Sequence, residues 1–292
     1  MTETAFEAVP GGVHSQLLLL CDHASNALPP RFGTLGLDPA LFATHIAYDI
    51  GAAMVTRALA AAYDAPALLG RWSRLLIDLN RGADDPTLVM KLSDGSIIPG
   101  NRDAGETEVA ARIAEFHAPY HAAITRTLDR LGAPSPLRDS ASAGEVAVAG
   151  SGREAPLKSI ARVARGASES RRGQKMPAVI SLHSFTPSWK TVPRKWEVGI
   201  LYDRDTRLAA PLMTRLAEAG FTVGDNEPYS GALEGDTLYR HGTLRNLPHV
   251  LIELRQDLIA DEASAQGFAL RLKPILDAAL HDLASNSEAV GR

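Results

Sequence analysis

The sequence lacks the features that stabilise secreted or membrane proteins. Only one of its 292 residues, Cys21, is a cysteine, so no disulfide can form within the chain and a disulfide-stabilised scaffold is excluded. The apolar run at residues 17–21 is far shorter than the roughly 20 residues that a membrane span requires. Residues 1–15 lack the basic segment and apolar run of a signal peptide. We therefore expect a soluble, cytoplasmic protein that does not associate with membranes.

The chain also lacks an excess of charge of one sign. Its 30 Lys and Arg residues stand against 34 Asp and Glu residues, a formal net charge of −4, which argues against a nucleic acid as partner. Hydrophobic residues make up 45% of the chain, too many for wholesale disorder. The length suffices for a large buried core, and we predict one domain over residues 1–292.

Short apolar runs alternate with segments of helical periodicity along most of the chain. This alternation predicts an α/β fold, with a mixed, mostly parallel central sheet and helices on both faces. The expected strands cover residues 17–21, 75–77, 179–182, 197–202, 222–223 and 250–254, and the expected helices cover residues 44–63, 106–131, 208–219 and 261–283. Residues 135–175 are rich in Ser, Ala, Gly and Arg without periodicity, and we predict a flexible insertion there, with a mobile lid or a contact with an acidic partner as the alternative.

Polar side chains follow several of the expected strands. Ligands of open α/β sheets bind beyond the carboxyl ends of the strands, so these side chains are the candidates for a site. They are Asp22 and His23, Asp78 to Arg81, His183 and Ser184, and Glu253 to Arg255. We expect them to lie at one edge of the sheet.

Two of these residues, His23 and His183, have the chemistry of metal ligands. A catalytic zinc site commonly uses three nitrogen or oxygen ligands and leaves one position for water. Asp49 lies among apolar residues in the expected first helix, where a buried carboxylate needs a partner, and it is our candidate for the third ligand. Asn26 is the alternative, although an amide oxygen is a poor zinc ligand beside a carboxylate.

Glu253 interrupts an otherwise apolar strand and is a candidate general base. The alternative is a structural salt bridge to Arg255. Asn80 and Arg81 are candidates for binding a substrate carboxylate, supplemented by Arg74 and Arg255, because a guanidinium group binds a carboxylate through two hydrogen bonds. Structural ion pairs with neighbouring aspartates are the alternative for these arginines.

Six segments, in this order, resemble motifs of the N-formylglutamate amidohydrolase family. They are DHASN at 22–26, HIAYDIG at 45–51, SRLLIDLNR at 73–81, ISLHSFTP at 180–187, YRHG at 239–242 and IELRQD at 252–257. The chain is also similar to the wider group of zinc carboxypeptidases, aspartoacylases and zinc-dependent cell-wall amidases. It departs from the carboxypeptidase pattern at Asn26, where those enzymes place a glutamate ligand.

The resemblance implies a zinc-exopeptidase-like fold and one Zn²⁺ ion held by His23, Asp49 and His183. It implies a metal-dependent hydrolase that cleaves a small anionic N-acyl amino acid, N-formyl-L-glutamate above all, in histidine degradation. Glu253 would be the general base, and His241 in the YRHG segment becomes a further catalytic candidate. A peptidoglycan amidase and a non-catalytic carboxylate-binding protein are the alternatives, and the oligomeric state is left open.

Overall fold

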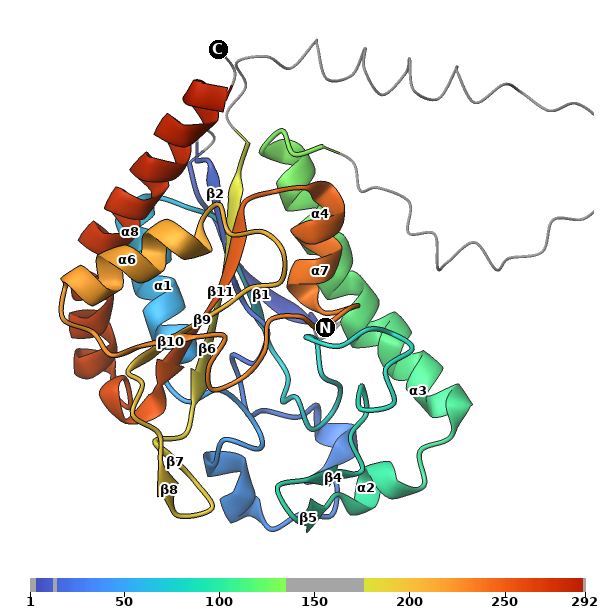
Figure 1. Cartoon of the computed structure of the whole chain (residues 1–292). Helices are drawn as coiled ribbons and strands as arrows, with labels where there is room; N and C mark the ends of the chain where they lie inside the picture. The colour runs from blue at the N-terminus through green and yellow to red at the C-terminus, as the bar shows by residue number, and fades with distance from the viewer. Residues whose placement is uncertain (1–3, 13–14, 135–175, 291–292) are drawn as a thin grey trace, which may run out of the picture.

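The leucines of β2 (Leu17–Cys21) are buried along the whole strand because a helical layer covers each side of it. Leu17, Leu19 and Cys21 pack in the core beneath α1 (Ala52–Tyr63) and α8 (Glu262–Val290), whereas Leu18 and Leu20 pack in the core beneath α4 (Ala118–Arg130). A continuous apolar run is therefore the correct pattern for this central strand. The computed structural model in Figure 1 describes residues 4–12, 15–134 and 176–290.

The central sheet has seven strands in the order β1-β3-β2-β6-β11-β9-β10. Besides β2 these are β1 (Phe6–Val9), β3 (Ala67–Gly70), β6 (Ala178–Phe185), β9 (Val198–Leu201), β10 (Val223–Asp225) and β11 (His249–Arg255). The neighbours β3–β2, β2–β6, β6–β11 and β9–β10 run parallel, whereas β1–β3 and β11–β9 run antiparallel. The predicted mixed, mostly parallel sheet is confirmed.

Helices cover both faces of this sheet, as predicted. One face carries α1 (Ala52–Tyr63), α6 (Ala209–Glu218) and α8 (Glu262–Val290), and the other carries α3 (Glu106–Arg112), α4 (Ala118–Arg130) and α7 (Thr237–His241) (Figure 1). A single π-helical turn (Ile113–His117) joins α3 to α4, so the long helix expected at 106–131 is continuous. No helix in the described part of the chain is long and apolar enough to cross a membrane.

Small elements gather at the lower end of the sheet in Figure 1, where β6 ends. They are the hairpin of β4 (Leu92–Ser93) and β5 (Ser96–Ile97), the hairpin of β7 (Ser188–Trp189) and β8 (Val192–Pro193), and the short helix α2 (Pro99–Arg102). The insertion predicted at 135–175 lies outside the described residues.

Two predicted elements differ from the structure. Residues 75–77 form a buried turn, and the strand of this region is β3, which ends five residues earlier at Gly70. The first helix begins at Ala52, not at residue 44. Leu75 and Ile46 pack together in a small core outside the sheet, so their apolar pattern reflects that core and neither a strand nor a helix.

Candidate metal and catalytic site

Three separate segments bring His23, Asp49 and His183 together. His23 directly follows β2, and His183 lies near the end of β6, the parallel neighbour of β2, so both rings reach the same edge of the sheet. Asp49 lies in the turn before α1, where its backbone N–H donates to the His23 carbonyl oxygen over 3.0 Å. Gly51 turns the chain into α1 at φ 84°, and a Cβ there would lie 2.1 Å from the Ile259 carbonyl oxygen, so this turn requires glycine.

The three side chains form a buried group that can hold a metal ion. Asp49 Oδ2 lies 3.3 Å from His23 Nδ1 and 2.8 Å from His183 Nδ1, and the ligand atoms all lie within 4.8 Å of one another. Two imidazole nitrogens and a carboxylate are a donor set that fits zinc and related divalent ions. Asn26 is exposed and donates to the Phe42 carbonyl oxygen, so the structure favours Asp49 as the third ligand.

A buried carboxylate lies behind each histidine ring. His23 Nε2 donates to Asp78 Oδ1 over 2.7 Å, and His183 Nε2 donates to Asp22 Oδ2 over 3.0 Å. Asp22 also accepts hydrogen bonds from Ser181 and Thr237. Such carboxylates fix the tautomer and direction of a metal-binding imidazole, and here they leave the Nδ1 atoms directed at Asp49.

The charges of the group stabilise one another against the cost of burial. Burial opposes ionisation of His183, yet its hydrogen bonds to Asp22 and Asp49 raise its pKa well above the usual value. The pKa of His23 is raised in the same way by Asp78 and Asp49, against burial and the charge of Arg74. The two histidines in turn hold the pKa of Asp49 below its usual range. Each ring has a carboxylate beside both of its nitrogens, an arrangement that favours the protonated form in the metal-free protein.

Glu253 lies beside this group on β11, paired in register with His183 on β6. Its side chain is buried, and its Oε2 atom has no hydrogen-bond partner among the described residues. Burial raises the pKa of Glu253 to about 7, and the charge of Asp49 adds to this rise against the opposing charge of His183. A buried carboxylate with an unpaired oxygen and a pKa near neutrality is suited to general base catalysis.

The predicted substrate-binding residues have different surroundings. Arg74 lies next to the candidate ligands, with Nη2 2.8 Å from Asp78 Oδ2 and Nη1 3.5 Å from Asp49 Oδ1. Asn80 donates its backbone N–H to Asp78, and its side-chain oxygen accepts from the backbone of Thr237. The remaining two arginines pair within their own loops, Arg81 with Asp85 and Arg255 with Asp257. Among the described contacts Arg255 therefore has a partner other than Glu253.

His241 lies in a second histidine cluster with His117 and His121. Burial lowers the pKa of His241 to about 3 and holds the pKa of His121 well below its usual value, so both rings are neutral. His121 Nε2 donates to the Leu79 carbonyl oxygen, so its Nδ1 accepts a hydrogen bond from His241 Nε2 over 2.9 Å. The single N–H group of His241 is thus directed at His121, and its predicted catalytic role stays a prediction.

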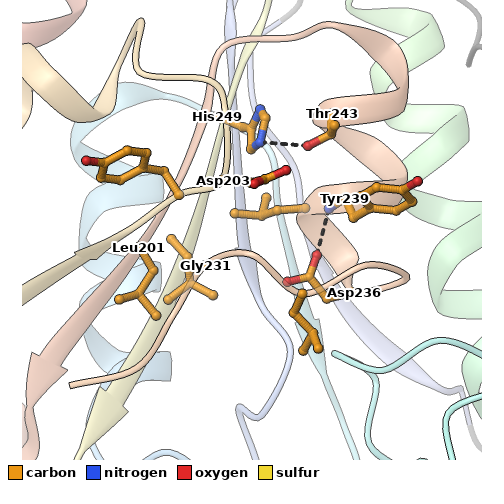
Figure 2. A pocket seen from close by; sticks show the side chains of 11 residues that line it. Leu201, Asp203, Gly231, Asp236, Tyr239, Thr243 and His249 are labelled. Atoms are coloured by element: carbon orange, nitrogen blue, oxygen red, sulfur yellow. Dashed lines mark hydrogen bonds between the residues drawn. The ribbon is translucent and has the colours of Figure 1, made fainter. Parts of the chain in front are cut away.

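A separate small hollow lies between β9, β11 and α7 (Figure 2). Its polar side chains already have partners within the protein. Asp236 accepts from the Tyr239 N–H group at the start of α7, and His249 bonds to Thr243. Burial raises the pKa of Asp236 to about 7. The hollow contains none of the three candidate metal ligands.

The sequence placed Asp22 and Asp78 among the candidate site residues without a role for either, and it did not point to Thr237. Asp22 begins the DHASN segment and Asp78 lies in the SRLLIDLNR segment, so each aspartate directly follows an apolar run. Their role could have been inferred from chemistry, because a metal-binding histidine usually donates its second ring N–H to an acceptor such as a carboxylate. Thr237 carries no such signal, because its contact with Asp22 joins residues 215 positions apart.

The fold is a mixed α/β sheet with helices on both faces, and the side chains at the edge of this sheet form a candidate metal site with a buried carboxylate beside it. The family model of N-formylglutamate amidohydrolase matches residues 15–137 and 160–260, and the chain belongs to this family. The resemblance read from the six motifs is thereby confirmed.

Two solved structures are similar to the chain over nearly its whole length. A gene product of Agrobacterium tumefaciens is 30% identical, with 97% of each chain covered and a TM-score of 0.77. An N-formylglutamate amidohydrolase from Ralstonia eutropha shares the fold at 19% identity and a TM-score of 0.60, with 98% of this chain and 100% of that chain covered. A comparison with curated proteins gives no match.

Proposed function

We propose that the protein is a metal-dependent hydrolase that cleaves the amide bond of an N-acyl amino acid, with N-formyl-L-glutamate as substrate. The observation that carries this proposal is the unpaired, buried oxygen of Glu253 beside His23, Asp49 and His183. Family membership supports the choice of an N-formyl amino acid. A cytoplasmic location and a role in histidine degradation stay predictions.

His23, Asp49 and His183 would hold the metal ion, and zinc is proposed from the type of these ligands. A bound divalent ion supplies Lewis acidity, which acidifies water and polarises a carbonyl group. Asp22 and Asp78 accept hydrogen bonds from the Nε2 atoms of the two histidines, which would leave both Nδ1 atoms available to a metal ion.

Glu253 moves the proton in the proposed reaction. Its carboxylate accepts a proton from the attacking water and then donates it to the nitrogen of the leaving amino acid. The raised pKa of Glu253 brings both steps within reach near neutral pH. Arg74, beside Asp49, would stabilise negative charge on the substrate, and Asn80, Arg81 and Arg255 are retained as proposed carboxylate-binding residues.

The experiment is formate release from N-formyl-L-glutamate by zinc-loaded protein, measured before and after chelation and again after zinc is restored. We expect activity that is lost with the metal and regained with it. Cleavage of muramoyl-peptide amides in place of formate release would favour the peptidoglycan amidase. Binding of N-formyl-L-glutamate without turnover would favour the non-catalytic carboxylate-binding protein. Undiminished hydrolysis by chelated, metal-free protein would contradict the mechanism.

A further inference from the structure

Arg194 is surrounded by three aromatic rings at the lower end of the sheet. Its guanidinium carbon lies 5.7 Å from the ring centre of Phe185, 5.6 Å from that of Trp189 and 5.1 Å from that of Tyr229. These distances are within the range of cation–π attraction. Arg194 directly follows the β7–β8 hairpin, and its backbone N–H donates to the Pro187 carbonyl oxygen, which fixes it beside the end of β6. The guanidinium group is therefore held in place from several sides.

This aromatic cage adjoins the candidate metal and catalytic site. Phe185 lies two residues after His183 on β6, so both side chains point to the same face of the sheet, about 7 Å apart along the strand. On the side of β11, Arg255, two residues after Glu253, donates from Nη1 to the Arg194 carbonyl oxygen over 3.5 Å. Burial raises the pKa of the Tyr229 hydroxyl, and the charge of Glu253 raises it further, against the opposing charge of Arg194. The cage thus forms the rim of the site on the side of β6 and β11.

The side-chain hydrogen bonds of Arg194 leave three of its five guanidinium N–H donors, those of Nε and Nη2, without a partner among the described residues. Within the described residues these side-chain bonds all involve Nη1, which donates to the Thr186 carbonyl oxygen, the Thr186 hydroxyl and the Tyr229 hydroxyl. These acceptors are neutral, whereas Arg74, Arg81 and Arg255 each have a carboxylate within 4.0 Å. Nε and Nη2 form the edge of the guanidinium group that binds a carboxylate through two parallel hydrogen bonds. At Arg194 this edge has no recorded partner among the described residues.

We propose that Arg194 is a further substrate-binding residue, whose Nε and Nη2 atoms bind a carboxylate of the substrate at the rim of the site. This inference rests on the proposed function, which supplies an anionic N-acyl amino acid. The cage holds the planar guanidinium group in position before the substrate arrives, which lowers the ordering cost of binding. N-formyl-L-glutamate offers two carboxylates, and the experiment below distinguishes them.

The test compares Arg194→Met with Lys195→Met by steady-state formate release from the zinc-loaded protein. Lys195 is the matched control, because it is the next residue, carries the same charge and is exposed. We expect Arg194→Met to raise the KM for N-formyl-L-glutamate about tenfold to a hundredfold, with kcat changed less than about threefold. Lys195→Met leaves both constants unchanged. A KM for Arg194→Met within about twofold of the control overturns the proposal.

Two further substrates identify the carboxylate. N-formyl-L-glutamine lacks the side-chain carboxylate, and N-formyl-4-aminobutyrate lacks the α-carboxylate. If Arg194→Met leaves the KM of one of these substrates unchanged, that substrate lacks the carboxylate that Arg194 binds. Either assignment supports the proposal. Arg194→Lys keeps the charge but loses the two-donor edge, so we expect an intermediate KM, and this variant decides the question if Arg194→Met does not fold. An unchanged KM for both substitutions refutes the proposal.

Binding without turnover separates this inference from the proposed function. The Kd of N-formyl-L-glutamate is measured by calorimetry on the zinc-loaded Glu253→Gln protein with and without Arg194→Met. If the wild-type protein releases no formate but the Kd rises about tenfold or more with Arg194→Met, the proposed function is wrong and the carboxylate site stands. If the wild-type protein releases formate and the Kd is unchanged, the carboxylate site is wrong. Absence of binding refutes both.

Discussion

Glu253→Gln is the substitution that tests the site most directly, because it removes a charge and keeps the shape of the side chain. The proposed general base would be lost, so we expect kcat for formate release to fall by about a hundredfold to ten-thousandfold. The zinc content should be unchanged, because Glu253 is not among the three candidate ligands. Metal analysis of the purified variant, beside its kinetics, checks both expectations.

The same substitution should stabilise the metal-free protein above neutral pH. The pKa of Glu253 rises from 4.5 in the unfolded chain to about 7 in the fold, a shift that corresponds to about 3 kcal/mol. Because the native state binds the proton more tightly than the unfolded state, stability falls as the pH rises from 4.5 to 7 and the full loss is present above pH 7. The amide introduced by Glu253→Gln carries no charge at any of these pH values, so this loss would disappear.

Urea unfolding of chelated protein at pH 8 and pH 5 measures this difference. We expect Glu253→Gln to exceed the wild type in free energy of unfolding by about 3 kcal/mol at pH 8 and by less than about 1 kcal/mol at pH 5. Glu234→Gln, at an exposed position, is the control and should show no such gain. Lower stability of Glu253→Gln than of wild type at both pH values would mean that the carboxylate makes stabilising contacts, and would refute the reasoning.

Three other predictions concern the histidines and their partners. Zinc affinity should rise with pH, because the pKa values of His23 and His183 are raised and zinc binding displaces their Nδ1 protons. Calorimetry in buffers of different ionisation enthalpy counts the released protons, and we expect up to about two per ion. Asp22→Asn should weaken zinc binding about tenfold to a hundredfold, measured by chelator competition. His241→Gln should lower the free energy of unfolding in urea by about 1–3 kcal/mol and lower kcat less than about tenfold, because the N–H group of His241 is directed at His121. A much larger fall in kcat would support a catalytic role for His241.

The position of the site could be predicted from the sequence because it follows from the direction of the strands. β2, β6 and β11 run parallel, so residues that come at or near their carboxyl ends meet at one edge, and His23, His183 and Glu253 were placed there. The segment at 73–81 was also predicted to lie at this edge, but from the wrong strand. Its strand is β3 and not residues 75–77, yet β3 also runs parallel to β2.

What the sequence could not supply depends on contacts between distant segments. The ring orientations of His23 and His183 are set by Asp78 and Asp22, which lie 55 and 161 residues away from them. The cage of Arg194 likewise joins distant segments: Phe185 on β6, Trp189 in the hairpin after it, and Tyr229, which lies 35 residues after Arg194. Periodicity reports which face of an element is apolar, and it carries no information about such contacts.

The charges around the candidate ligands favour a divalent ion. In the metal-free protein three buried aspartates, Asp22, Asp49 and Asp78, are balanced by Arg74 and by two protonated histidines. A divalent ion that displaces the two Nδ1 protons leaves this balance unchanged, because two positive charges replace two others. A monovalent ion would leave one negative charge buried without a partner, which is costly in an interior of low dielectric constant.

The second histidine cluster provides the contrast: His121 and His241 have no carboxylate partner among the described contacts, and burial keeps both neutral. The carboxylates, and not the histidines themselves, therefore determine which of the two clusters is suited to a cation.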